Sequence, residues 1–138
     1  MIGDGKFNPG FRISKFDIFV LVGGAVGTVI LCSVIGKIGL VVAFVVGHFF
    51  LFCNVFRIAR NLEFLWAGAF VAFAGSTVML HWPSWPITIA AMICTSTIVI
   101  VVEIRKPSYH GVGWNVFNPN LRDWWDANVE HEREAPTV

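Results

Sequence analysis

The sequence predicts an all-α integral membrane protein: four transmembrane helices in an up-down bundle, plus a short cytoplasmic amphipathic C-terminal helix. First, 56% of its 138 residues are hydrophobic and only 14% are charged, which leaves too little charge to cover a soluble domain. Second, the apolar residues fall into four blocks, each close to the roughly 20 residues that cross a hydrocarbon core. Third, the basic residues gather on one side of a four-span arrangement.

The four predicted spans cover residues 17–36, 38–56, 62–80 and 86–102, within a transmembrane domain of residues 17–106. Glycines at both ends of residues 36–39 allow a tight turn, and so short a link forces the first two spans into an antiparallel hairpin. Pro83 and Pro86 lie between the third and fourth spans, where proline ends one helix and begins the next. Residues 1–16 and 107–138 remain as N-terminal and C-terminal tails.

The distribution of positive charge predicts the orientation. Nine of the ten lysines and arginines fall on one side of the four spans, and only Lys37 falls on the other. Basic residues are retained in the cytoplasm, so both termini are predicted to be cytoplasmic. A bacterial-type inner membrane is the expected location, with the lipid bilayer as the first partner. A net charge of +1 predicts no nucleic-acid partner.

The C-terminal tail contains one predicted helix, at about residues 119–130. Asn118 and Pro119 are typical of a helix cap followed by proline in the first turn. Leu121, Trp124 and Trp125 recur at helical spacing among charged residues. This amphipathic pattern predicts a helix that docks on a partner protein, or one that lies on the inner leaflet.

His48 is the one ionisable residue near the centre of a predicted span. Ionisable groups at this depth are costly and are often functional. One interpretation is a ligand or hydrogen-bond partner for haem, chlorophyll or quinone. The other is a neutral imidazole bonded to Thr28 or Thr95 on a neighbouring helix. No second histidine lies at a similar depth, so a haem would need its other ligand from water or another chain.

Polar residues also cluster at the inner end of the second span. Asn54, Arg57 and Asn61 are spaced three and four residues apart and therefore share one helical face, with Arg60 beside them. One interpretation is a site that contacts a lipid headgroup or an anion. The alternative is a set of interfacial charges and ion pairs that anchor the helix ends.

Small residues recur at four-residue intervals on the first and third spans. Gly23 and Gly27 form a G-x-x-x-G pattern, and Gly68, Ala72 and Ser76 repeat the interval. Such spacing lets another helix approach closely, so these five residues are predicted to pack against a helix of this chain or of a second protein.

Catalytic patterns are not evident in the sequence, and the chain is predicted not to be an enzyme. The spans carry no paired carboxylates, no metal-ligand cluster and no nucleophile with a base beside it. Thr95, Ser96 and Thr97 are interpreted as helix-packing hydroxyls. The three cysteines form no C-x-x-C pair and are interpreted as small buried side chains.

Three hypotheses of function follow from these patterns. The leading one is a non-catalytic accessory or assembly subunit of a larger membrane protein complex, respiratory or photosynthetic, acting through helix packing and tail docking. A second is a small oligomeric transporter or channel with a polar site around His48 and Asn54. A third is a subunit that binds haem, a pigment or quinone through His48.

Overall fold

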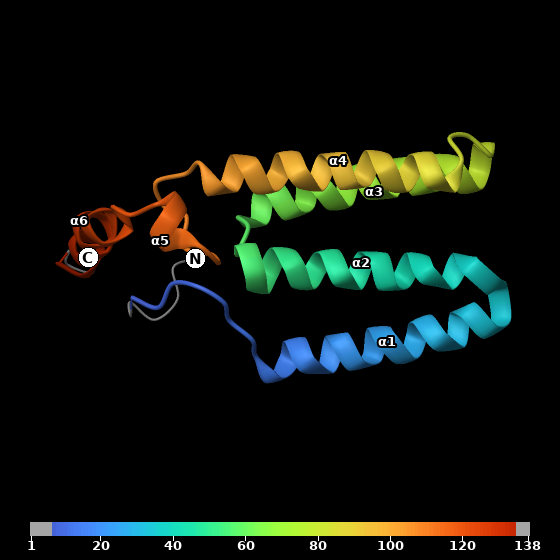
Figure 1. Cartoon of the computed structure of the whole chain (residues 1–138), viewed down its shortest axis with the longest axis horizontal. Helices are drawn as coiled ribbons and strands as arrows, with labels where there is room; N and C mark the ends of the chain where they lie inside the picture. Colours follow the sequence, from blue (N-terminus) through green and yellow to red (C-terminus); the bar gives the residue numbers. More distant parts are fainter. Residues whose placement is uncertain (1–6, 135–138) are drawn as a thin grey trace.

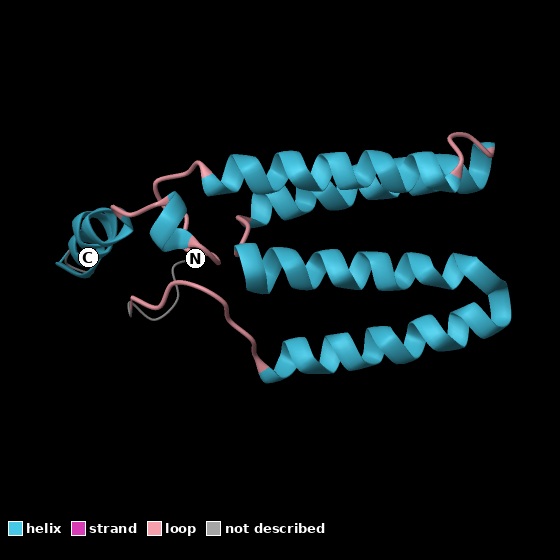
Figure 2. Cartoon of the chain, viewed as in Figure 1, coloured by secondary structure: helices cyan, strands magenta, loops and turns pink. Residues whose placement is uncertain are grey.

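The computed structural model describes residues 7–134, and these residues form helices joined by short loops, with no strand among them (Figure 2). The prediction of an all-α fold is therefore confirmed for this part of the chain. The elements are α1 (Lys15–Ile35), the 3₁₀ helix η1 (Gly36–Gly39), α2 (Leu40–Phe50), the π-helical η2 (Leu51–Phe56), α3 (Arg60–Leu80), α4 (Trp85–Ile104), α5 (Trp114–Phe117) and α6 (Leu121–Glu134).

Three helices, α1, α3 and α4, are long and apolar enough to cross a membrane. This finding indicates a membrane protein. The second predicted span is shorter, because α2 and η2 together make 17 residues, or roughly 25 Å at 1.5 Å per residue. A hydrocarbon core is about 30 Å thick. That this second segment crosses the membrane therefore remains a prediction.

The four long elements form two antiparallel hairpins, as Figure 1 shows. Helix α1 packs against α2, and α3 packs against α4. The η2 segment also touches α4, which joins the two hairpins. Residues 7–14 lie at the same end of the bundle as α5 and α6 (Figure 1). We call this assembly of residues 7–14 and 105–134 the end cap.

Helix α1 begins two residues earlier than predicted because Ser14 caps it. The Ser14 amide donates to Asp17 Oδ2 at 2.6 Å, and the Asp17 amide donates to Ser14 Oγ at 3.2 Å. This reciprocal pair is a capping box, which satisfies two amides that a helix start otherwise leaves unbonded. The other spans differ from their predicted bounds by similarly small shifts at their ends.

Two glycines outside the predicted packing set, Gly24 and Gly39, bring α1 close to its neighbours. A Cβ at Gly24 would lie 2.8 Å from both Cγ atoms of Val46 on α2. A Cβ at Gly39 would overlap the backbone nitrogen of Cys32 on α1. Absence of a side chain at these two positions therefore permits the close packing of the α1–α2 hairpin.

The apolar core lies where η2 meets α3 and α4. It contains Phe52, Ile58, Trp66, Met92 and Val99. Trp66 Nε1 donates to Ser96 Oγ at 2.8 Å, and that hydroxyl donates to the Met92 carbonyl at 2.7 Å. The Ser96 hydroxyl thus has both a donor and an acceptor partner, and it links α3 to α4 within the buried core.

The end cap is tied to the bundle through backbone hydrogen bonds. The Val112 amide donates to the Val55 carbonyl at 2.8 Å, and the Gly10 amide donates to the His110 carbonyl at the same distance. Inside the cap, Tyr109 is buried and its hydroxyl donates to the Val112 carbonyl at 2.7 Å. These bonds hold a loop from each end of the chain against the end of η2.

Candidate functional site

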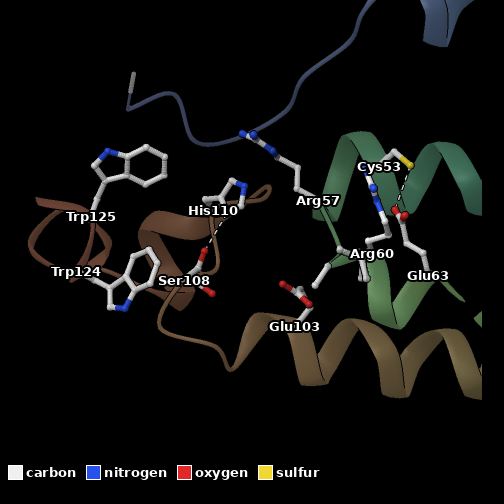
Figure 3. A pocket seen from close by; sticks show the side chains of 11 residues that line it. Cys53, Arg57, Arg60, Glu63, Glu103, Ser108, His110, Trp124 and Trp125 are labelled. Carbon is white, nitrogen blue, oxygen red and sulfur yellow. Dashed lines mark hydrogen bonds between the residues drawn. The ribbon is translucent and has the colours of Figure 1, made fainter. Parts of the chain in front are cut away.

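A cavity of about 640 Å³ lies between the end cap and the ends of η2, α3 and α4. We call it the end chamber. Figure 3 shows Arg57, Arg60, Glu63 and Glu103 facing it from the helix ends, while other side chains face it from the end cap. The chain therefore encloses a polar and aromatic space at one end of an otherwise apolar bundle. The side chains from the end cap are Ser108, His110, Trp124 and Trp125.

The acidic side chains of the chamber already have partners. Glu103 is only 4% exposed, and its carboxylate forms an ion pair with Lys106 Nζ at 2.6 Å. The Glu63 carboxylate accepts a hydrogen bond from Cys53 Sγ at 3.2 Å. Lys106 thus neutralises the charge of Glu103. The Glu63 carboxylate, in contrast, accepts only from the weakly donating Cys53 thiol.

The basic side chains of the chamber are not neutralised in the same way. Arg57 Nη1 donates to the Asn8 carbonyl at 2.8 Å, which is a bond to a neutral group. Among the side chains that the structure describes, those of residues 7–36 and 38–128, neither Arg57 nor Arg60 forms an ion pair. Two guanidinium groups therefore face one unneutralised carboxylate, and the chamber carries an excess of positive charge.

Arg57 owes its position to the way η2 ends. Its backbone is left-handed, with φ 50° and ψ 50°, a conformation that is uncommon for a residue with a side chain. The Ile58 amide closes this last turn by donating to the Phe52 carbonyl at 2.8 Å. Burial lowers the pKa of the Arg57 guanidinium, and the nearby charge of Arg12 lowers it further. The group stays protonated at neutral pH, because arginine titrates far above that range.

His110 is held neutral in the chamber wall. Its Nδ1 lies 2.9 Å from the Ser108 carbonyl oxygen. Burial lowers its pKa and the charge of Arg57 adds to this, while the Ser108 carbonyl and the Glu103 carboxylate act in the opposite direction. At neutral pH, the imidazole therefore adds no charge to the two arginines.

Acid is expected to loosen the end cap through His110. The pKa of His110 is lowered on folding, so between this lowered pKa and about 6.5 the unfolded chain binds more protons than the folded one. The free energy of unfolding therefore decreases as the pH decreases through this window. Hydrogen exchange at the Gly10 amide, which donates to the His110 carbonyl, measures the effect. Its protection should fall as the pH drops from about 7 to about 5, and this fall should vanish in His110→Asn. Equal loss of protection in parent and variant would assign the effect to another group.

A second, apolar cavity of about 220 Å³ adjoins the chamber. We call it the apolar slot. It lies between α2, η2 and the first turns of α3, and Glu63 lines both it and the end chamber. The polar chamber and the apolar slot thus share one lining residue, Glu63. The other side chains of the slot are Val45, Phe49, Phe52, Phe64, Trp66 and Ala67.

His48 lies beside these cavities but is among the lining residues of neither. Its ring stacks on Trp66, with centroids 5.0 Å apart. Its Nδ1 lies 2.8 Å from the Phe44 carbonyl oxygen of its own helix. Thr28 and Thr95, the partners expected from the sequence, instead donate to carbonyls of their own helices. Binding of haem, chlorophyll or quinone at His48 remains a prediction, and residues 7–134 contain no group of three or more metal-binding side chains.

The four residues predicted to contact lipid or an anion divide into two pairs. Arg57 and Arg60 line the end chamber. Asn61 is exposed and does not line it. Asn54 is 3% exposed, and its amide nitrogen, oriented to satisfy its neighbours, donates to the Arg12 carbonyl at 2.6 Å and to Asp17 Oδ2 at 2.9 Å. Asn54 thus joins the start of α1 to the end of η2.

The predicted docking residues of the tail helix contact the chain itself. Leu121 is fully buried, and Trp125 packs edge-to-face against Phe7 with centroids 5.7 Å apart. Trp124 and Trp125 both line the end chamber. His110 was not predicted to line a site, because only the fold brings the loop after α4 to this cavity.

The predicted packing residues of α1 and α3 face away from the other helices. A Cβ at Gly23, Gly27 or Gly68 would meet no atom within 4 Å. Ala72 is exposed, and the Ser76 hydroxyl donates to the Trp82 carbonyl in the loop beyond α3. These small-residue faces are therefore open on the surface of the chain.

Comparison with models of known protein families, with curated proteins and with solved structures finds no match. Function is therefore inferred from the geometry of the chain. Two features stand out as means of interaction: the open small-residue faces of α1 and α3, and the cationic end chamber with its adjoining slot.

Proposed function

We propose that this chain is a non-catalytic accessory subunit of a larger membrane complex, which it joins by packing its open small-residue faces against helices of other subunits. The observation that carries the proposal is the open space at Gly23, Gly27 and Gly68. In lipid, helices associate through close van der Waals packing, and small residues permit that approach. These faces are unused within the chain and thus available to a neighbour.

Helix α1 supports this proposal most clearly. None of its residues is buried, although it is 21 residues long. Large apolar side chains such as Phe19 and Val29 project from it. Lipid can cover such side chains, but the G-x-x-x-G face between them is shaped for a helix.

In the proposed arrangement, the chain crosses the bilayer four times and keeps both termini in the cytoplasm. Helix α2 with η2 provides the second crossing, because a span somewhat shorter than the hydrocarbon core is accommodated by local thinning of the bilayer. The bias of lysines and arginines supports the orientation. Respiratory and photosynthetic complexes are proposed as hosts by analogy with other assemblies built from many small helical subunits.

Filling the groove on α1 is expected to release the chain from its complex. The double variant Gly23→Leu with Gly27→Leu places bulk where a partner helix would approach, and a Cβ at either position meets no atom of the chain itself within 4 Å. Gentle extraction from native membranes followed by native sizing should show the parent in a particle larger than one chain. Most of the double variant should run as a single chain, and the fraction of the chain that stays in the larger particle should fall at least about tenfold.

Ala25→Leu is the matched control, because it adds the same side chain on a different face of α1. It should leave the parent's particle size unchanged. A parent that extracts as a single chain, or a double variant that keeps its partners, would refute the proposal.

A further inference from the structure

The end chamber and the apolar slot are arranged like the two halves of an amphiphile. The chamber lies beyond the helix ends, and the slot runs along the first turns of α3 from Glu63 to Ala67. If α3 crosses the bilayer, the chamber lies at headgroup depth and the slot within the hydrocarbon. A lipid has its polar and apolar parts in this same order.

The chamber's charges favour a phosphate. Arg57 is partly buried, and the charge of Arg12 further disfavours its charged form. A desolvated guanidinium is stabilised when an anion accepts its hydrogen bonds. Guanidinium groups match phosphate oxygens in geometry, so Arg57 and Arg60 are suited to hold such a group between them.

Glu63 adds a second requirement. Glu63 lines both the chamber and the slot, and its carboxylate can accept more hydrogen bonds than the one from Cys53. It would repel a bare anion but bind a hydroxyl or ammonium group that follows the phosphate. The headgroup therefore needs a hydrogen-bond donor next to its phosphate.

The walls of the two cavities fit the remaining parts of such a ligand. Trp124 and Trp125 form the chamber wall on the end cap (Figure 3), and indole rings favour the boundary between headgroups and hydrocarbon. Phe64, which lines the slot, is 68% exposed. The slot therefore opens sideways on the apolar surface of the chain, where a lipid chain can enter from the bilayer.

We infer that the end chamber and the apolar slot form one binding site for a membrane phospholipid. Arg57 and Arg60 hold the phosphate, Glu63 accepts from a hydroxyl or amine of the headgroup, and one acyl chain lies in the slot. The site is distinct from the α1 face proposed to bind other subunits, so either proposal can fail without the other.

Titration of the delipidated full-length protein in a neutral detergent, followed by native mass spectrometry, tests this site. The probes are a phosphatidylglycerol, a phosphatidylethanolamine, a phosphatidylcholine and soluble glycerol phosphate. The first two supply a phosphate with a donor and should bind at least about tenfold more tightly than phosphatidylcholine, whose headgroup has no donor. Soluble glycerol phosphate lacks the acyl chain and should bind more weakly still.

Arg60→Gln and Arg57→Gln should each weaken binding of phosphatidylglycerol about tenfold, because each removes a charge-assisted hydrogen bond. Arg105→Gln is the matched control, since Arg105 is exposed at the end of α4 and does not line the chamber. Arg60 is also exposed, so its variant keeps the test valid if Arg57→Gln disturbs the turn after η2.

Phe64→Ala tests the slot by itself. It should weaken binding of the long-chain lipids severalfold and leave the affinity for soluble glycerol phosphate unchanged, whereas Phe73→Ala, elsewhere on α3, should alter neither. Three results would overturn the inference: equal affinity for phosphatidylcholine, equal affinity for soluble glycerol phosphate, or an equal loss of affinity in Arg105→Gln.

Discussion

Replacing Gly39 by alanine is expected to open the α1–α2 hairpin and to lower the free energy of unfolding by about 3 kcal/mol. Gly39 is buried, and its φ of −56° and ψ of −26° suit any residue, so the backbone conformation itself costs nothing. The cost is steric. The new Cβ would overlap the backbone nitrogen of Cys32 and lie 2.8 Å from the Leu31 carbonyl carbon. Backbone atoms cannot rotate away as a side chain does, so the two helices must separate.

Gly47→Ala is the matched control on the same helix. A Cβ at Gly47 meets no atom within 4 Å, and alanine in a helix interior is favoured over glycine by about 0.5–1 kcal/mol. The two substitutions should therefore shift stability in opposite directions. Unfolding in mixed micelles, followed by tryptophan fluorescence, measures both. Equal stability of Gly39→Ala and the parent would show that the turn is looser than described.

Replacing Asn54 by leucine is expected to detach the N-terminal segment and to lower the free energy of unfolding by about 2 kcal/mol. The buried Asn54 amide bridges the Arg12 carbonyl and the Asp17 carboxylate. Leucine has a similar size but no donor, so both acceptors lose a partner. An unpaired acceptor away from water costs more than the lost hydrogen bond is worth.

Asn54→Asp should be more damaging than Asn54→Leu, because it places a second carboxylate at hydrogen-bond distance from Asp17. Asn61→Leu is the control, since Asn61 is exposed one turn away and should change stability by less than about 0.5 kcal/mol. Protease accessibility of residues 7–14, together with unfolding in mixed micelles, measures the effect. Parent-like resistance in Asn54→Leu would contradict the bridging role.

The helices could be predicted from the sequence because their signals are local. Long apolar blocks, the glycines at Gly36 and Gly39 and the prolines at Pro83 and Pro86 mark the elements and their turns without knowledge of the fold. A cap such as Ser14 moves a boundary by one or two residues, which apolar periodicity does not resolve. The π-helical end of the second segment also left no clear signal, because an extra residue in a turn is fixed by packing at Phe52 and Ile58.

The end chamber could not be predicted, because its walls come from distant parts of the chain. Arg57 was singled out by its spacing and Arg60 as its neighbour, but His110 approaches them only through hydrogen bonds between loops. The glycines of α1 likewise show that spacing in the sequence does not identify the neighbour of a helix face. The G-x-x-x-G spacing marked Gly23 and Gly27, while the face that α2 covers is set by Gly24 and Val46. Spacing reveals that a groove exists but not which helix occupies it.

Labelling of single cysteines tests the four-span membrane arrangement most directly. In a background with Cys32, Cys53 and Cys94 replaced, Lys37→Cys and Ser84→Cys report the connections at one end of the bundle, and Asn61→Cys reports the first turn of α3 at the other. An impermeant maleimide applied to intact cells should label the cysteines at positions 37 and 84, and should reach position 61 only after permeabilisation. Labelling of positions 37 and 61 from the same side would show that α2 and η2 do not cross the bilayer, and would contradict the arrangement.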